Sequence, residues 1–243
     1  MRTDGRKPDD LRPVHFERDY TDFAPGSVLA TMGRTKVLCT ASVDEKVPRW
    51  MQGSGKGWVT AEYSLLPGST AERVNREAVK GRQSGRTQEI QRLIGRSLRA
   101  VTDMRTMGEV QVVLDCDVLQ ADGGTRTASI CGAWVALHDA LTRRVQHNPG
   151  LAHPVTEGCA AISVGLVDAV ALLDLDYSED VRAEVDMNVV MTSSGRFVEV
   201  QGTAEGLAFT RSQLDDLLGL AEQGIARILD LQATLVAEPP QPR

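Results

Sequence analysis

The chain has 243 residues, of which 42% are hydrophobic and 25% charged, and its formal net charge is −6. This length can bury a large core, so we expect one domain over residues 1–243, with flexible ends at 1–10 and 237–243. Apolar runs of 18 residues and the apolar segment of a signal peptide are both absent from the sequence. A cytoplasmic protein with no membrane partner is therefore expected.

The cysteines and histidines do not have the spacing of a disulfide framework or a zinc site. Each cysteine lies far from the others, in or beside an apolar stretch. Zinc ligands and disulfide scaffolds instead show short, paired spacings. We therefore expect reduced thiols in the core at Cys39, Cys116, Cys131 and Cys159.

The first 65 residues have the pattern of short strands separated by turns. Apolar and polar residues alternate, and Gly, Pro and charged residues divide the segments. The predicted strands cover residues 14–20, 27–32, 35–43 and 58–65. A β-rich sheet is therefore expected to open the fold.

The segment 68–105 carries nine Lys or Arg residues against four Asp or Glu, which makes it +5 in a chain whose remainder is −11. Residues 67–85 have no apolar period and predict a mobile loop, whereas apolar residues recur at helical spacing from Ile90 to Val101. Guanidinium groups can grip two phosphate oxygens, so the segment indicates a polyanionic partner. A solvated helix face has the same charge pattern and is the alternative.

A glycine turn between a predicted strand and a predicted helix is a candidate anion site. Apolar and polar residues alternate over 109–119, and apolar residues recur at helical spacing over 130–141. Between them stand Gly124, Thr125 and Arg126, where free amides, the positive end of a helix dipole and a forked donor would meet an anion. The spacing matches neither a Walker loop nor a dinucleotide fingerprint, and an ordinary tight turn is the alternative.

The second half of the chain adds strands at 160–167, 170–175, 181–191 and 196–200. Thr210 and Gln213 form a capping-box pattern, and the apolar residues that follow predict a helix to about residue 236. The order of elements is that of an α+β fold.

Two aspartates near the start of the third of these strands are candidate metal ligands. In an extended chain, residues six apart face the same side, so Asp180 and Asp186 are expected to project into one site together with Glu184. Such a pair is suited to magnesium or manganese, although an acidic turn beside an edge strand is the alternative. An anion cradle, an arginine-rich loop and paired carboxylates are the parts that phosphoryl transfer on RNA or DNA requires.

Six blocks of sequence are distinctive: DGR at 4–6, GRQSGRT at 81–87, RLIGRSLR at 92–99, DGGTRTAS at 122–129, DMNVVMT at 186–192 and EVQGTAEG at 199–206. Together they resemble the ribonuclease PH family of phosphate-dependent exoribonucleases, which trim the 3′ ends of transfer RNA precursors. The resemblance covers residues 6 to about 232. The family usually has Ser after the Glu179-Asp180 pair, where this chain has Val181.

The resemblance assigns roles to the candidate residues. It implies that inorganic phosphate, the co-substrate, binds at Arg86, Gly124, Thr125 and Arg126. It implies that Asp180 and Asp186 serve in catalysis and hold a divalent metal, Mg or Mn; one of them acting as a general acid is the alternative. For RNA contact, the family's loop and the basic segment together supply the candidates Arg73, Arg76, Arg82, Arg92, Arg96 and Arg99.

The resemblance also implies a fold and an assembly. The fold is a single α+β domain with β-sheets packed against helices, and six identical chains form a ring as a trimer of dimers. The implied reaction releases nucleoside 5′-diphosphates from RNA and can run in reverse. An inactive RNA-binding ring subunit and a hydrolytic nuclease are the other readings left open by the sequence.

Overall fold

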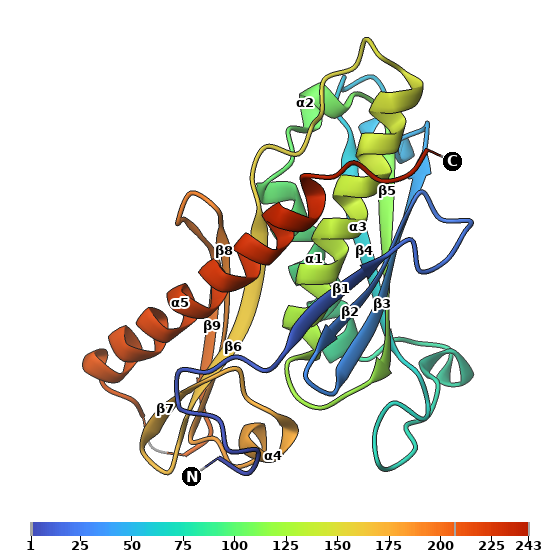
Figure 1. The fold of residues 1–243 in the computed structure, drawn as a ribbon. Coiled ribbons are helices and arrows are strands. Elements are labelled where there is room, and N and C mark those ends of the chain that lie inside the picture. Colours follow the sequence, from blue (N-terminus) through green and yellow to red (C-terminus); the bar gives the residue numbers. More distant parts are fainter. Residues whose placement is uncertain (1, 207, 243) are drawn as a thin grey trace.

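The computed structural model describes residues 2–206 and 208–242, and the first half of the chain forms a five-stranded sheet (Figure 1). Its strands are β1 (Val14–Arg18), β2 (Gly26–Met32), β3 (Thr35–Asp44), β4 (Trp58–Leu65) and β5 (Gln111–Gln120). Their order is β1-β2-β3-β5-β4, and only the β4–β5 pair is parallel. The five predicted strands are confirmed to within about two residues at most ends.

The second half forms a four-stranded antiparallel sheet in the order β7-β6-β8-β9. Its strands are β6 (Cys159–Val167), β7 (Val170–Leu173), β8 (Val185–Thr192) and β9 (Phe197–Ala204). The prediction of one strand over 181–191 was wrong at its start. Residues Tyr177–Asp180 form a helical turn, α4, and the strand begins only at Val185.

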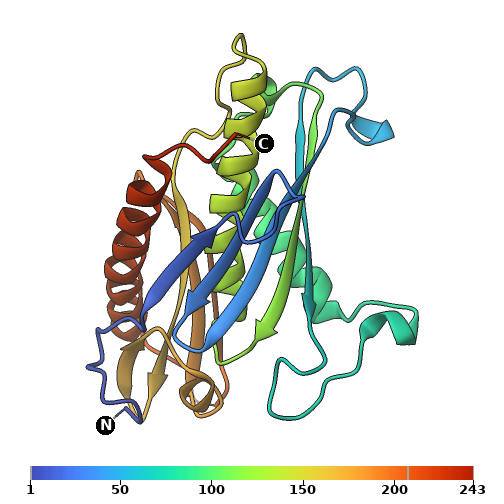
Figure 2. The same ribbon diagram turned by 45° about the vertical axis from the view of Figure 1, so that its right-hand side comes forward.

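The helices lie between the sheets and outside them. They are α1 (Gly85–Ala100), α2 (Met104–Met107), α3 (Thr125–His147), α4 and α5 (Arg211–Val236), with 3-10 helices η1 (Arg49–Met51) and η2 (Glu77–Lys80). Figure 2 shows α3 between the two sheets and α5 along the other side of the four-stranded sheet. The Thr210–Gln213 capping box and the end of α5 at Val236 confirm the prediction for this helix.

One hydrophobic cluster joins the two halves of the molecule. It includes Leu114 of the first sheet, Leu137 of α3 and Ile162 of the second sheet. Every residue of β6 is buried, because this strand packs against both α3 and α5. The single domain over 1–243 stays a prediction, and the shared core is what such a domain requires.

The four cysteines are buried and unpaired, as predicted. Burial raises the pKa of Cys131 to about 12 and also raises the pKa of Cys159. These thiols are therefore packing groups of the core. Among the helices of the described residues, none combines the length and apolar character needed to cross a membrane.

Both chain ends make specific contacts with the body of the fold. Arg2 is 7% exposed and binds Glu179, while Arg143 donates to the carbonyl of Gln241. The flexibility of residues 1–10 and 237–243 stays a prediction.

Arg18 of β1 is bound twice to Asp139 of α3, at 2.8 and 2.6 Å, and also donates to the carbonyl of Leu235 at the end of α5.

We expect Arg18→Gln to lower the free energy of unfolding by about 3 kcal/mol, because it leaves the fully buried Asp139 carboxylate without its main partner. Burial acts to raise the pKa of Asp139, but bonds from His138 and Arg18 outweigh it and lower that pKa. The ion pair therefore contributes stability above the unfolded pKa of 3.8 and loses it as the pH falls further. Urea unfolding at pH 7 and pH 3 measures this; an equal loss at both pH values would contradict it.

Candidate active site

A cavity of about 890 Å³ lies where β5 ends and α3 begins. In Figure 1 this turn, α4 and the loop that follows β4 lie at the same end of the molecule. The structure brings together here the residues predicted to bind phosphate or to act in catalysis. The cavity is lined by Arg86, Gly124, Thr125, Arg126, Asp180 and Asp186.

The glycine turn has the backbone that an anion cradle needs. Gly123 and Gly124 have φ angles of 73° and 64°, in the left-handed region that glycine adopts without strain. Gly124 is the N-cap of α3 and supplies no capping side chain, so the first amides of this 23-residue helix are not used by a cap. The hydroxyl of Thr125 lies 2.8 Å from the hydroxyl of Tyr63 on β4. This arrangement can bind a phosphate ion.

The same turn is packed directly against the chain that leads into α4. A Cβ atom built on Gly123 would lie 2.5 Å from the carbonyl oxygen of Leu175 and 2.9 Å from the amide nitrogen of Tyr177. No side chain fits there, because both neighbours are backbone atoms. The close approach brings the cradle next to the helical turn that carries Asp180.

The two aspartates reach the cavity from different elements. Asp180 ends α4 and Asp186 is the second residue of β8, so the expected placement of both on one strand face was wrong. The reason is local: Asp176 and Glu179 form a capping box that starts a helical turn. The expectation that Glu184 joins them was also wrong, since Glu184 is not among the residues that line the cavity.

The electrostatics of the site favour a bound cation and a bound anion together. Burial, followed by the charge of Asp180, raises the pKa of Asp186 to about 6. Burial also raises the pKa of Asp180, against the opposing charges of Arg86 and Arg126. Asp186 is half-buried and Asp180 keeps more access to solvent, and both carboxylates line the same cavity as the two guanidinium groups.

Arg126 is held by two residues that the sequence analysis missed. Its Nη1 donates to Gln201 Oε1 at 2.5 Å and to Glu89 Oε1 at 3.3 Å, and Gln201 Nε2 donates to Glu89 Oε1 at 2.7 Å. Gln201 lies in the block at 199–206, which was the available signal, but its partner is 75 residues away. These bonds fix the direction of the guanidinium toward the cavity.

Further polar residues line the cavity without having been predicted. Ser163 and Asn188 are direct partners on β6 and β8, and Tyr63 comes from β4. Ser163 is 3% exposed, and its hydroxyl has no hydrogen-bond partner within the described structure. The available signal, which the sequence analysis did not use, was a lone serine inside the apolar run 160–167.

The arginines predicted to contact RNA are divided among several places. Arg76 and Arg82 line a second cavity of about 660 Å³, and Tyr63 lines both cavities. Arg73 is exposed in the loop between β4 and η2 and donates to Asn75. Arg76 and Arg82 therefore lie beside the candidate active site.

The remaining three arginines lie on α1, outside both cavities. Arg92 is exposed, and Arg96 is paired with Glu199. The guanidinium of Arg99 lies 4.5 Å above the ring of Trp58 and donates to the carbonyl of Val59. Contact of all six arginines with RNA stays a prediction.

Comparison with known proteins identifies the family of the chain. Two sequence models of the 3′ exoribonuclease family match it, domain 1 over residues 10–142 and domain 2 over residues 159–224. The chain belongs to the 3′ exoribonuclease family. A ribonuclease PH of Rhodospirillum rubrum is 56% identical over 237 residues, which cover 98% of this chain and 99% of that protein. The resemblance noted in the sequence is thereby confirmed.

Solved structures show that the fold is shared with other proteins. Rice Rrp46 has a TM-score of 0.78 at 19% identity, covering 96% of this chain and 99% of its own. An Archaeoglobus fulgidus exosome with RNA bound to its active site has a TM-score of 0.80 at 19% identity, covering 95% and 92%. The ribonuclease PH-type α+β fold predicted from the sequence is confirmed.

We expect Asp186→Asn to stabilise the protein at alkaline pH in the absence of metal. A folded-state pKa of about 6 above an unfolded value of 3.8 means that the aspartate contributes stability at low pH and loses it as the pH rises through 6. At pH 8 the neutral amide should raise Tm by about 3–6 °C, equivalent to about 1–2 kcal/mol. The difference should vanish at pH 4 in thermal melts with chelator; a destabilised variant at pH 8 would contradict the assignment.

Proposed function

We propose that this member of the 3′ exoribonuclease family is a phosphate-dependent 3′-to-5′ exoribonuclease that trims transfer RNA precursors. It releases nucleoside 5′-diphosphates and, in reverse, extends RNA from them. The observation that carries the proposal is the single cavity in which a helix N-terminus, two arginines and two carboxylates meet. The near-complete match to a ribonuclease PH supports it.

Phosphate is the nucleophile in this proposal. The amides at Gly124 and Thr125, the Thr125 hydroxyl, Arg86 and Arg126 hold it at the start of α3. A phosphate oxygen then attacks the last phosphodiester in line, and the 3′ oxygen of the shortened RNA leaves. Because two anions must approach each other, positioning and charge compensation supply most of the catalysis.

A divalent metal fits the carboxylate pair. Asp180 and Asp186 offer hard oxygen ligands, and magnesium often takes one or two protein carboxylates together with substrate phosphates. The described residues contain no group of three or more His, Cys, Asp or Glu placed to hold a metal, so substrate oxygens would complete the coordination. Bound there, Mg or Mn would neutralise charge on the reacting phosphate.

The family membership also supports a proposal about the assembly of the protein and its location. We propose a homohexamer, built as a trimer of dimers, that acts on RNA in the cytoplasm. The structural similarity to exosome subunits supports association of several chains. Arg73 and Arg76, on the loop beside the cavity, and Arg82, Arg92, Arg96 and Arg99 are the proposed RNA contacts.

The central experiment supplies or withholds phosphate. Pure protein with a 3′-extended transfer RNA and magnesium should produce nucleoside diphosphates only when phosphate is present. Monophosphates formed without phosphate would indicate a hydrolytic nuclease instead, and binding without products would indicate an inactive RNA-binding subunit.

Arg126→Ala should reduce phosphorolysis by about 100-fold to 1,000-fold, as loss of one preorganised donor to a reacting anion does. The fold should persist, because Arg126 points into the cavity and is held by the exposed Glu89 and by Gln201. Circular dichroism serves as the control for folding. Full activity in this variant would remove Arg126 from the phosphate site.

The loop arginines should act on RNA affinity. If Arg73 and Arg76 bind single-stranded phosphates, each lost contact should flatten the slope of log K against log salt by about 0.7. The double alanine variant tests this by RNA binding at several salt concentrations. An unchanged slope would show that these residues are only a solvated surface.

A further inference from the structure

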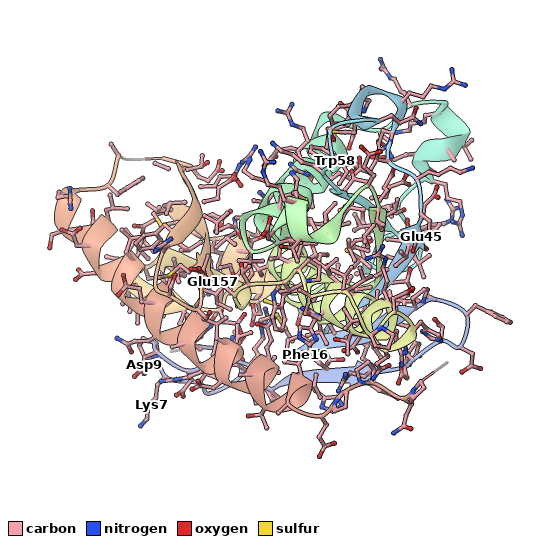
Figure 3. All side chains as sticks on the ribbon, turned by 90° about the horizontal axis from the view of Figure 1, so that it is seen from above. Lys7, Asp9, Phe16, Glu45, Trp58 and Glu157 are labelled. Carbon is pink, nitrogen blue, oxygen red and sulfur yellow. The ribbon has the colours of Figure 1, made fainter. Side chains whose placement is uncertain are left out.

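The N-terminal strap, defined as residues 2–12, includes the DGR block at 4–6 that has no role in the site described above. It runs beside α4 at the active-site end of the molecule (Figure 1). Figure 3 shows Lys7 and Asp9 at the edge of the molecule next to α5, where Arg227 donates to the carbonyl of Asp9 at 3.2 Å. The strap is therefore anchored on its outer side as well.

Arg12 joins the phosphate cradle to the segment that precedes α4. Its Nη1 donates to the carbonyl of Asp122 in the cradle turn at 2.5 Å, while its Nη2 and Nε donate to the carboxylate of Asp174 at 2.6 and 3.0 Å. Burial acts to lower the pKa of Arg12, but the charge of Asp174 outweighs it and raises that pKa. The guanidinium is therefore a fixed, permanently charged link between the two segments.

Arg2 grips the helical turn that carries Asp180. Its Nε donates to Glu179 Oε1 and its Nη2 donates to Glu179 Oε2, both at 2.8 Å. Nη2 also donates to the carbonyl of Asp174 at 2.8 Å. Glu179 is the neighbour of Asp180 and completes the capping box of α4 by accepting from the amide of Asp176 at 3.1 Å. A planar, two-bond grip of this kind fixes direction as well as distance.

The strap is held by buried ion pairs, although apolar packing would hold a chain end without the free-energy cost of removing charges from water. Arg2, Arg12, Asp174 and Glu179 are each 7% exposed or less. Replacing a buried ion pair by apolar residues is often neutral or stabilising, so such pairs are weak evidence for a purely stabilising role. Directed hydrogen bonds fix the relative position of the groups that they join, and here they join the cradle to the chain segment that carries Asp180.

We propose that Arg2 and Arg12 are positioning residues for the reaction, which set the spacing between the phosphate cradle and Asp180. The inference rests on the proposed function, because it concerns the same site. Neither arginine touches the substrate; each acts through the residue that it holds. A misplacement of about 1 Å at a reacting group can cost about 100-fold in rate, which makes such bonds consequential.

The two arginines should affect different kinetic constants. Arg2 holds only the α4 side, so Arg2→Gln should lower kcat by about 10-fold to 100-fold and leave KM for phosphate within about twofold. Arg12 also holds the cradle, so Arg12→Gln should raise KM for phosphate as well. Phosphorolysis of a short tailed RNA over a range of phosphate concentrations separates the two effects.

Arg18→Gln is the matched control. It breaks a buried two-bond pair of the same kind, Arg18 with Asp139, which lies on β1 and the middle of α3 rather than at the site. Its loss of stability should be comparable, but kcat and KM should be those of the unchanged protein at temperatures where all variants are folded. Equal kcat in Arg2→Gln and Arg18→Gln would overturn the proposal.

A double variant separates positioning from stability. In Arg2→Gln the buried Glu179 carboxylate loses its two-bond partner and keeps only Arg6, whose Nη2 lies 3.6 Å from Oε2. Adding Glu179→Gln removes that poorly compensated charge, so thermal stability should return part of the way toward that of the unchanged protein. Under the proposal kcat stays low, because a glutamine side chain at position 2 is shorter than that of arginine and cannot reach position 179 in the same geometry. Recovery of kcat along with Tm would show that Arg2 only stabilises the fold, which would overturn its positioning role.

The failure of the proposed function is distinguishable from the failure of this inference. If the unchanged protein shows no phosphate-dependent release of diphosphates, the proposed function fails. If the unchanged protein is active and Arg2→Gln behaves as Arg18→Gln does, only the positioning role fails.

Discussion

The contact of the β5–α3 turn with the chain entering α4 decides where the groups of the active site lie. Gly123 approaches the backbone of Leu175 and Tyr177 so closely that no side chain can stand between them. The turn begins a long helix in the centre of the molecule, whereas α4 belongs to the loop between β7 and β8. Close backbone contact therefore joins an anion-binding helix end to the helical turn that carries Asp180, in the loop between two strands of the second sheet.

The site is electrostatically unfavourable for the protein alone. Burial raises the pKa of both Asp180 and Asp186, and the hydroxyl of Ser163 is buried without a partner. Groups of this kind lower the stability of the folded chain and are typical of functional sites. The rest of the fold offsets that cost through a core that runs continuously from the first sheet through α3 to the second.

Local patterns allowed much of the fold to be predicted from the sequence, and long-range contacts explain what was missed. The alternation in the first four strands and the capping box at Thr210 act over a few residues, so they are visible in the sequence. Asp176 and Glu179 form the same capping pattern, but no apolar run follows, and Asp180 was expected to lie in an extended segment together with Asp186. The residues that orient Arg126 and the cradle, Gln201 and Arg12, contact them across 75 and 110 residues, a relation that one sequence does not reveal.

The wide spread of the site along the chain has a consequence for biosynthesis. Its walls come from positions as far apart as Arg34 and Asn188, and Arg126 is held by Gln201 of β9. In addition, β4 reaches its parallel neighbour β5 only after the intervening α1 has crossed over. Contacts between such distant segments form slowly, because a long loop must close before any bond repays the lost chain entropy. A nascent chain emerging from the ribosome would thus remain catalytically silent until β9 has been synthesised and joined to the second sheet.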